Sequence, residues 1–408
     1  MNTTKNKKFN LKKQIGLIYT SGFFSGLRIT DAVWVALLVA RGFSLWEIGF
    51  AESVFHIVSL MCEVPSGMFA DMLGRKKTLV LGGLLITIYN ILMAFAPNML
   101  IVCLAMGLNA LAYTMFSGTD SAMTYDSLKQ ENKTDDYIKI NARCTQINLI
   151  ASALGSLAST LVNILKYTGF YLLSGAFECT SMISHALMTE PVVTEAQADR
   201  ESRSFLDTLK KVPMLFVNLC RDSFSILKSC PFAVKLIIST AIVSIPTYLT
   251  KMFLQERLIE LGWSSKFLFV PTILSSAAAI FGTLLAAKAK IKSVRKLYFI
   301  CAILVGGGTV LVGTANAWIS ILGMMLVQSV LEIWFLVESQ KLNDVIPSDQ
   351  RATIISVDGM CYSLLMIPTS PLVGKIGDIF GNAGAGLTVL GVLVMLSSFC
   401  VFTRRKNN

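Results

Sequence analysis

Charged residues are scarce in this chain of 408 residues. Asp, Glu, Lys and Arg together make up 15% of it, and only two histidines occur. Hydrophobic residues make up 54%, and the mean hydropathy is +0.63. A soluble globular protein of this length could not hide so much apolar surface. The composition therefore predicts a polytopic membrane protein that has lipid as its solvent.

Signatures of common enzyme sites are also missing. The sequence has no GxSxG, no Walker loop and no HExxH, so it does not indicate a hydrolase, a nucleotide-driven pump or a zinc protease. Its nine cysteines lie mostly inside apolar runs and lack metal-ligand spacing, which argues against a disulfide framework and a zinc site. We expect a protein that is not an enzyme, has no cofactor or metal, and draws energy from a gradient.

Long apolar runs dominate what is present. Twelve runs have about 20 residues each, the length that crosses a bilayer as a helix. They lie at 15–39, 46–69, 78–96, 99–122, 142–164, 167–189, 232–255, 265–287, 297–315, 317–340, 352–374 and 384–403. The pattern predicts an all-α polytopic membrane protein with twelve transmembrane helices.

Lysine and arginine predict the topology of these spans. The net charge of +11 could indicate nucleic-acid binding, but the basic residues cluster between the apolar runs, as topology signals do. If both termini are cytoplasmic, only six of the 36 basic residues lie outside, namely Arg41, Lys166, Lys251, Arg257, Lys266 and Lys375. We therefore expect a multi-pass protein of the plasma membrane, specifically a bacterial inner membrane, with both termini cytoplasmic and no nucleic-acid partner.

One long polar segment, from Glu190 to Lys228, separates the sixth and seventh runs. Its apolar residues recur at helical spacing beside lysines, which predicts an amphipathic helix on the inner leaflet. The chain then divides into an N-terminal six-helix half (1–189), a cytoplasmic linker (190–231) and a C-terminal six-helix half (232–408). An acidic pattern at 120–126 recurs at 338–344, and this favours a parallel repeat of six plus six spans.

The turn between the second and third runs carries a motif. Gly67, Asp71, Gly74, Arg75 and Lys76 stand in the order GxxxDxxGRK. This turn resembles the cytoplasmic signature of the major facilitator superfamily of secondary transporters, and the chain as a whole resembles the 12-span drug–proton antiporters. Its fourth span lacks the buried arginine typical of many proton-coupled members.

The resemblance implies two six-helix pseudo-repeats that work by alternating access, with the substrate path between them. It also implies a cytoplasmic gate in which Asp71 and Arg75 form a charge cluster with an acid at the end of the fourth span. Asp120 is the candidate for that acid.

Ionisable residues inside the first two spans are the main candidates for a functional site, because each costs roughly 2.5–3.5 kcal/mol at a helix centre. Arg28 and Asp31 lie one turn apart, and Glu52 and His56 share one face of the second span. Arg28 lies roughly 20 Å from the inner end of its span and Glu52 roughly 9 Å from the outer end of its own, in a core of about 30 Å. The two could therefore pair.

Two roles stay open for these residues. In the first, Arg28 neutralises Asp31 or Glu52 and locks two helices together. In the second, Asp31, Glu52 or His56 exchanges protons and Arg28 is the partner charge.

Other polar and aromatic residues within the spans could line a substrate path or pack between helices. They are Asn109, Tyr113, Gln146, Glu178, Gln328, Glu332, Trp334 and Tyr362. The carboxylates among them would favour cationic or zwitterionic compounds.

These patterns predict a monomer in the lipid bilayer that exports amphiphilic drugs or antibiotics in exchange for protons. One alternative is a symporter or facilitator that imports a small metabolite. A second is a membrane receptor or scaffold that does not transport.

Overall fold

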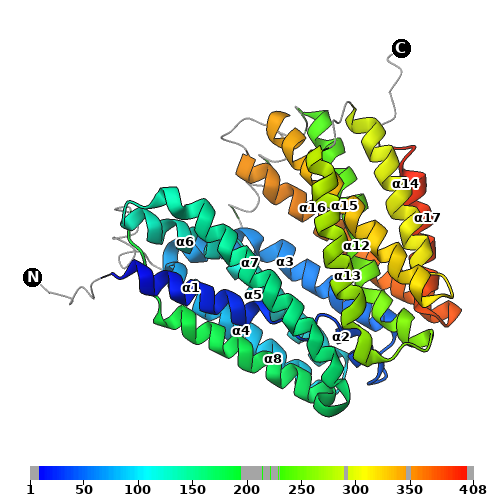
Figure 1. Ribbon diagram of the computed structural model, residues 1–408, viewed down its shortest axis with the longest axis horizontal. Coiled ribbons are helices and arrows are strands. Elements are labelled where there is room, and N and C mark those ends of the chain that lie inside the picture. The colour runs from blue at the N-terminus through cyan, green and yellow to red at the C-terminus, as the bar shows by residue number, and fades with distance from the viewer. Residues whose placement is uncertain are drawn as a thin grey trace, which may run out of the picture. The chain divides into compact units, whose positions relative to one another are not determined.

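The computed structural model describes residues 9–193, 230–288, 293–345 and 351–401, together with Met214, Arg221 and Lys228. Every element in these ranges is a helix (Figure 1). Contacts between residues divide the chain into two compact units. The first comprises Met1–Thr30, Met61–Ala158 and Ile164–Phe216, and the second comprises Asp31–Leu60, Ser159–Asn163 and Val217–Asn408. The first two predicted spans are therefore each shared between the units.

The first unit is built from antiparallel helices joined by short turns. It contains α1 (Leu11–Gly26), the second part of α3 (Leu45–Leu73), α4 (Arg75–Phe95), α5 (Met99–Phe116), α6 (Thr119–Gln130), η1 (Thr134–Asp136), α7 (Tyr137–Ser156) and most of α8 (Val162–Leu187). Helix α4 packs along α5, and α1 packs along α7. The side chain of Gln14 ties the start of α1 to the end of α8, since it donates to the Thr189 carbonyl oxygen at 3.0 Å and accepts from the Thr189 N–H at 2.9 Å.

The second unit contains the remaining helices. They are α2 (Trp34–Val39), the first part of α3, η4 (Ser265–Phe267), α12 (Pro231–Glu260), α13 (Phe269–Lys288), α14 (Val294–Val312), α15 (Ala317–Val345), α16 (Arg351–Phe380) and α17 (Ala383–Ser397). Helix α14 packs against both α15 and α17, and α12 contacts α15, α16 and α17 (Figure 1). Phe253, Tyr298 and Trp334 are fully buried and form much of the core.

Small residues allow α3 and α16 to touch within this unit. A Cβ atom added to Gly49 would lie 2.5 Å from the carbonyl oxygen of Ser370, and one added to Gly374 would overlap the carbonyl oxygen of Leu45. The carboxylate of Asp378 also accepts hydrogen bonds from the Leu45 and Trp46 N–H groups at 3.0 and 2.8 Å. An acid on α16 therefore caps the N-terminus of α3.

The all-helical membrane fold is confirmed. In the described part of the chain, eight helical segments are long and apolar enough to cross a membrane, and a further apolar helix, Ala383–Ser397, is shorter. One of the eight, Thr134–Leu187, has 54 residues and covers the fifth and sixth predicted spans. Lys166 interrupts it with a φ of 51°, at the place where the sequence predicts the turn. The count of twelve spans and the division at 189 and 231 stay predictions.

Three predicted spans are not single α-helices. The fifth passes from α7 into the 3-10 helix η2 (Leu157–Leu161) before α8 begins at Val162. The first is broken between Gly26, where α1 ends, and Trp34, where α2 begins. The fourth is broken at Ser117 and Gly118, where Gly118 takes a left-handed conformation before α6 begins. The amphipathic helix predicted for the linker lies almost entirely outside the described residues.

Candidate functional site

A carboxylate and an imidazole are buried side by side on α3. Glu52 is 2% exposed and His56 is 5% exposed, and His56 Nε2 lies 3.4 Å from Glu52 Oε1. The other ring nitrogen, Nδ1, is 3.2 Å from the hydroxyl of Ser363 on α16. The ring of Tyr362 stands edge-on to the imidazole, with 5.5 Å between ring centroids. Helix α16 therefore fixes the imidazole on two sides.

A third helix of the second unit completes this cluster. The phenol of Tyr248, on α12, is hydrogen-bonded to Glu52, and Asp31 lies within electrostatic range of the same phenol. Sequence reasoning found Glu52, His56 and Tyr362 but missed Tyr248 and Ser363, because a single hydroxyl in an apolar run has no periodicity to reveal it. The buried polar cluster thus joins α3, α12 and α16.

Arg28 and Asp31 lie in the break of the first span rather than on a continuous helix. Their side chains are exposed, whereas Ile29, Ala32 and Val33 are buried at 3%, 3% and 0% exposure. The irregular backbone therefore turns both charges away from the packed interior. Arg28 belongs to the first unit and Asp31 to the second. The predicted pairing of Arg28 with Glu52, another residue of the second unit, stays a prediction.

The first unit carries a polar group of its own. Glu63 accepts a side-chain hydrogen bond from Ser117, and Tyr113 lies within electrostatic range of both Glu63 and Arg28. Tyr113 is 56% exposed. A cation, a carboxylate and a phenol are thus grouped within one unit.

The cytoplasmic signature forms an ion pair, but with a different acid from the one predicted. Arg75 Nη2 lies 2.8 Å from Asp126 Oδ2, whereas Asp120 lies 3.9 Å from His185 Nε2. The break at Gly118 starts a new helix, and Asp126 is on its second turn, within reach of the guanidinium. The expectation that Asp120 is the partner of Arg75 is therefore wrong.

The start of α4, which follows this turn, is capped by an acid that comes after α8 in the chain. Glu190 accepts hydrogen bonds from the backbone N–H groups of Arg75 and Lys76 at 2.8 and 2.7 Å, which satisfies the N-terminus of α4. Gly74, the residue before the helix, has a φ of 90°, a conformation that favours glycine. Gly67 is exposed. The side chain of Asp71 lies outside the described residues.

The residues predicted to line a cavity have mixed environments. Gln146 is exposed, and Asn109, Gln328, Glu332 and Tyr362 are half-buried. Glu178 is buried at 8% exposure. Gln328 donates to Glu332 on its own helix at 3.2 Å.

Trp334 does not line a cavity. It is fully buried, and its Nε1–H donates to the Thr240 hydroxyl at 3.0 Å. Thr240 also hydrogen-bonds Glu338, an acid that is 2% exposed and lies near the charge of Asp358. The tryptophan therefore belongs to the core of the second unit.

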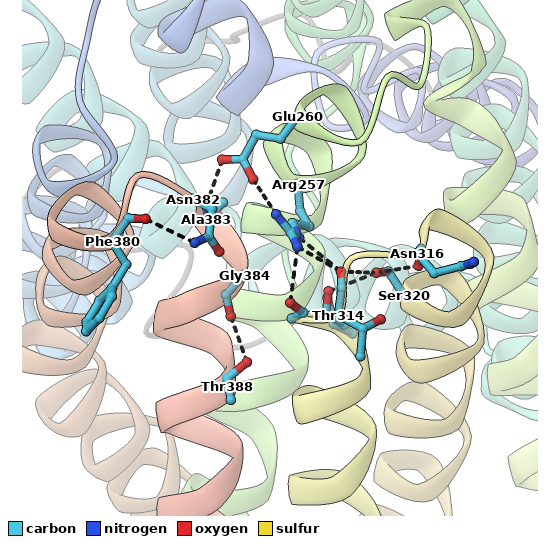
Figure 2. Close-up of polar contacts among 12 residues, drawn as sticks. Arg257, Glu260, Thr314, Asn316, Ser320, Phe380, Asn382, Ala383, Gly384 and Thr388 are labelled. Atoms are coloured by element: carbon cyan, nitrogen blue, oxygen red, sulfur yellow. Dashed lines mark hydrogen bonds and ion pairs between the residues drawn. The ribbon is translucent and has the colours of Figure 1, made fainter.

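A partly buried charge pair serves a structural role (Figure 2). Arg257 donates from Nη1 to Glu260 Oε2 at 2.9 Å and from Nη2 to the carbonyl oxygen of Thr314 at 2.9 Å, at the end of α14. Glu260 Oε1 accepts from the N–H of Ala383 at 2.7 Å, at the start of α17. The cation thus lies at a helix C-terminus and the anion at a helix N-terminus, as the helix dipoles require.

These features define a class of protein. Apolar helices that share buried ionisable side chains, together with a spanning helix broken next to charged residues, are typical of membrane transporters. Among the described residues, no group of three or more His, Cys, Asp or Glu side chains comes together as a metal site would require.

The chain belongs to the Major Facilitator Superfamily, whose sequence profile matches residues 17–367. It is similar to the uncharacterized MFS-type transporter YxaM of Bacillus subtilis (strain 168), with 22% identity over 397 residues that cover 94% of this chain and 96% of that protein. The crystal structure of the nucleoside transporter NupG superposes with a TM-score of 0.75, at 15% identity, over 97% of this chain and 100% of that one. The D-xylose-proton symporter gives a TM-score of 0.65, also at 15% identity, over 97% and 98%. The protein is thus a multi-pass membrane transporter.

Proposed function

We propose that this protein is a secondary transporter that exports amphiphilic compounds in exchange for protons. The observation that carries the proposal is the buried pair of Glu52 and His56 and its contacts with α12 and α16. Two groups that can each take up a proton lie 3.4 Å apart, away from water. A proton added to or taken from such a pair changes a charge in a medium of low dielectric constant, where its effect is large.

The cluster offers a way to couple that charge to the helices. When His56 is neutral, only one of its ring nitrogens carries a hydrogen, so the contacts to Glu52 and Ser363 depend on the protonation state. Tyr248 provides a further hydrogen bond to the same carboxylate. We infer that protonation of the pair changes how α3 is held against α12 and α16, and that this change accompanies the switch between outward-facing and inward-facing states.

Support for an amphiphilic substrate comes from the side chains near the break of the first span. Glu63 and Tyr113 combine a carboxylate with an aromatic face in the first unit. In the second unit, the ring of Tyr362 lies beside His56. A carboxylate attracts a cationic group, and an aromatic ring binds the apolar or cationic part of the same molecule. Cationic or zwitterionic amphiphiles are therefore the proposed class.

The direct test is transport in proteoliposomes that contain the purified protein, with ethidium and tetraphenylphosphonium as amphiphilic cation probes. Replacing the carboxylate by an amide in Glu52→Gln should abolish uphill transport driven by an imposed pH gradient and spare downhill counterflow. Glu47→Gln is the matched control, because Glu47 lies on the same helix outside the cluster and its amide can still accept the hydrogen bonds from Ser44. Uphill transport by the Glu52→Gln variant would reject Glu52 as the essential proton carrier.

Uptake of a metabolite is the second candidate function. The solved transporters with the same fold are named for a nucleoside, for peptides and for D-xylose with protons, and the polar residues of both units could bind such compounds. The same vesicles separate the two functions. Uptake of uridine or D-xylose together with protons would support symport, and proton movement opposite to the cation probes would support export. No flux of any probe would support a receptor or scaffold.

A further inference from the structure

The break in the first span is occupied by a side chain from a distant helix. Gln255, on α12, donates from Nε2 to the carbonyl oxygen of Asp31 at 2.8 Å. Its Oε1 accepts a hydrogen bond from the N–H of Val35 at 3.0 Å. In a continuous α-helix, the N–H of Val35 would bond the carbonyl of Asp31 directly, because the two residues are four apart. The carboxamide of Gln255 therefore takes the place of one helical hydrogen bond.

We propose that Gln255 is a positioning residue that holds the first span open at this point. A side chain inserted into the ladder of helical hydrogen bonds is an established cause of a helix break. The local sequence contributes the Ser25–Gly26 pair, where α1 ends, but residues 27–33, which include Asp31, contain neither glycine nor proline. Gln255 is 7% exposed, so water does not offer the freed backbone groups an equivalent partner.

Packing in the first unit supports the other side of the break. A Cβ atom on Gly155 of α7 would lie 2.6 Å from the carbonyl oxygen of Leu27, and one on Gly26 would lie 2.9 Å from the Cβ of Ala151. The end of α1 is therefore pressed against α7, while the start of α2 is held by α12. The division between the two contact units falls between Thr30 and Asp31, within the break. The break, called the hinge below, thus lies where the chain passes from the first unit to the second.

The two backbone groups can change their hydrogen-bond partner, and this gives the hinge two states. With the carboxamide inserted, the Asp31 carbonyl and the Val35 N–H each bond Gln255, and the span is broken. With the carboxamide withdrawn, the two backbone groups can bond one another, and the helix can close across the break, with the N–H groups of Ala32 and Val33 bonded to the carbonyl oxygens of Arg28 and Ile29. Either state satisfies both groups, which a buried site requires. The role in transport rests on the proposed function; the role in holding the break does not.

Hydrogen exchange at single-residue resolution, on the full-length protein in lipid nanodiscs, tests the insertion. Gln255→Met keeps the length of the side chain but cannot form either hydrogen bond. We expect the Val35 amide to stay protected, and the amides of Ala32 and Val33 to exchange at least tenfold more slowly than in the wild type, because the helix closes across the break. Faster exchange at Val35, or no change at Ala32 and Val33, would overturn the proposal.

Two further variants guard against misfolding and general loosening of α12. Gln255→Glu, in its protonated form, can still accept from Val35 and donate to Asp31, so at acidic pH the break should persist and Ala32 and Val33 should exchange as in the wild type. Thr250→Val removes a buried hydroxyl of α12 that has no hydrogen-bond partner among the described residues, and it should leave exchange from 31 to 35 unchanged. Slowed exchange at Ala32 and Val33 in either variant would contradict the assignment to the carboxamide.

Transport by the same variants distinguishes this proposal from the proposed function. Gln255→Met should lower the maximal rate of probe transport at least fivefold and leave the half-saturating probe concentration within twofold, because the hinge limits switching and does not touch the probe. Slowed exchange without any transport by the wild type would uphold the hinge and reject the transport function. An unchanged maximal rate, together with slowed exchange, would reject the role of the hinge in transport.

Discussion

Replacing Arg257 by alanine would uncover the ends of two helices at once. The guanidinium donates to the carbonyl oxygens of Gly313 and Thr314 at the C-terminus of α14, at 3.3 and 2.9 Å, and to Glu260 at 2.9 Å. Glu260 in turn accepts from the first N–H of α17, that of Ala383 (Figure 2). Because one side chain orients the other, loss of the cation also loosens the cap of α17.

The size of the effect follows from burial. The Arg257 side chain is 10% exposed and that of Glu260 is 23% exposed, so removal of the cation leaves the carboxylate only partly hydrated. Breaking a buried pair by removing one partner costs about 3–5 kcal/mol, and the partial exposure of Glu260 places Arg257→Ala near 3 kcal/mol. Arg257→Lys keeps the charge but loses the planar fork and should cost about half as much. Glu260→Gln keeps an acceptor for Ala383 and should cost about 1 kcal/mol.

Thermal unfolding of the detergent-solubilised protein, followed by tryptophan fluorescence, measures these differences as a rank order of apparent Tm. Alanine at 257 should lower the Tm most, lysine less, and glutamine at 260 least. Lys266→Ala is the matched control, because it removes one positive charge from the same predicted face and its side chain is exposed. A Tm for Arg257→Ala equal to that of the control, or equal values for alanine and lysine at 257, would refute the reasoning.

Two further predictions concern the contact between α3 and α16. Asp378→Asn should weaken the cap on Leu45 and Trp46 by about 0.5–1 kcal/mol. The resulting decrease in Tm should become smaller at about 1 M salt, because the carboxylate is exposed to screening. A decrease in Tm that does not depend on salt would exclude the charge as its cause. Gly374→Ala should destabilise by about 1–3 kcal/mol, because the added methyl group overlaps the backbone of α3. Gly359→Ala, on the same helix, is the matched control for Gly374→Ala, because nothing lies within 4 Å of the added methyl group. The control should be neutral or stabilise the protein by about 0.5–1 kcal/mol. Equal effects of the two glycine variants would contradict the packing argument.

The helices could be predicted from the sequence, and the break in the first span could not. An apolar run predicts a helix because every backbone group in lipid has to be paired within the segment. Residues 27–33 contain neither glycine nor proline, and Gly26, where α1 ends, is one of many glycines inside the predicted spans. What interrupts the helix is Gln255, 224 positions from Asp31 along the chain, and only tertiary structure brings it there.

The cytoplasmic signature is a second feature that the sequence predicts only in part. The sequence correctly placed Arg75 in the turn and an acid at the end of the fourth span. It could not choose between Asp120 and Asp126, because the choice depends on the left-handed conformation of Gly118 and on the direction in which α6 then runs. It also assigned Glu190 to the linker, whereas that carboxylate caps α4.

Five of the polar side chains described above satisfy the ends of helices. Glu190 caps the N-terminus of α4, Asp378 that of α3 and Glu260 that of α17. Arg257 covers the C-terminus of α14, and Gln255 pairs both groups freed by the break in the first span. Helix ends near or within a membrane cannot rely on water for these bonds, so such residues are explained by structure alone.

Glu52 and His56 do not fit that explanation. Both are buried, both lie in the middle of α3 rather than at its end, and their polar contacts are to side chains of α12 and α16. His56 Nε2 has no hydrogen bond within the described structure beyond its 3.4 Å approach to the carboxylate. Apolar residues of similar volume can often replace a buried ionisable pair without loss of stability. Stability therefore does not explain why this chain has Glu52 and His56 at these buried positions. A site that has to gain and lose a proton would give such a reason, and this is the argument for the proton exchange proposed for this pair.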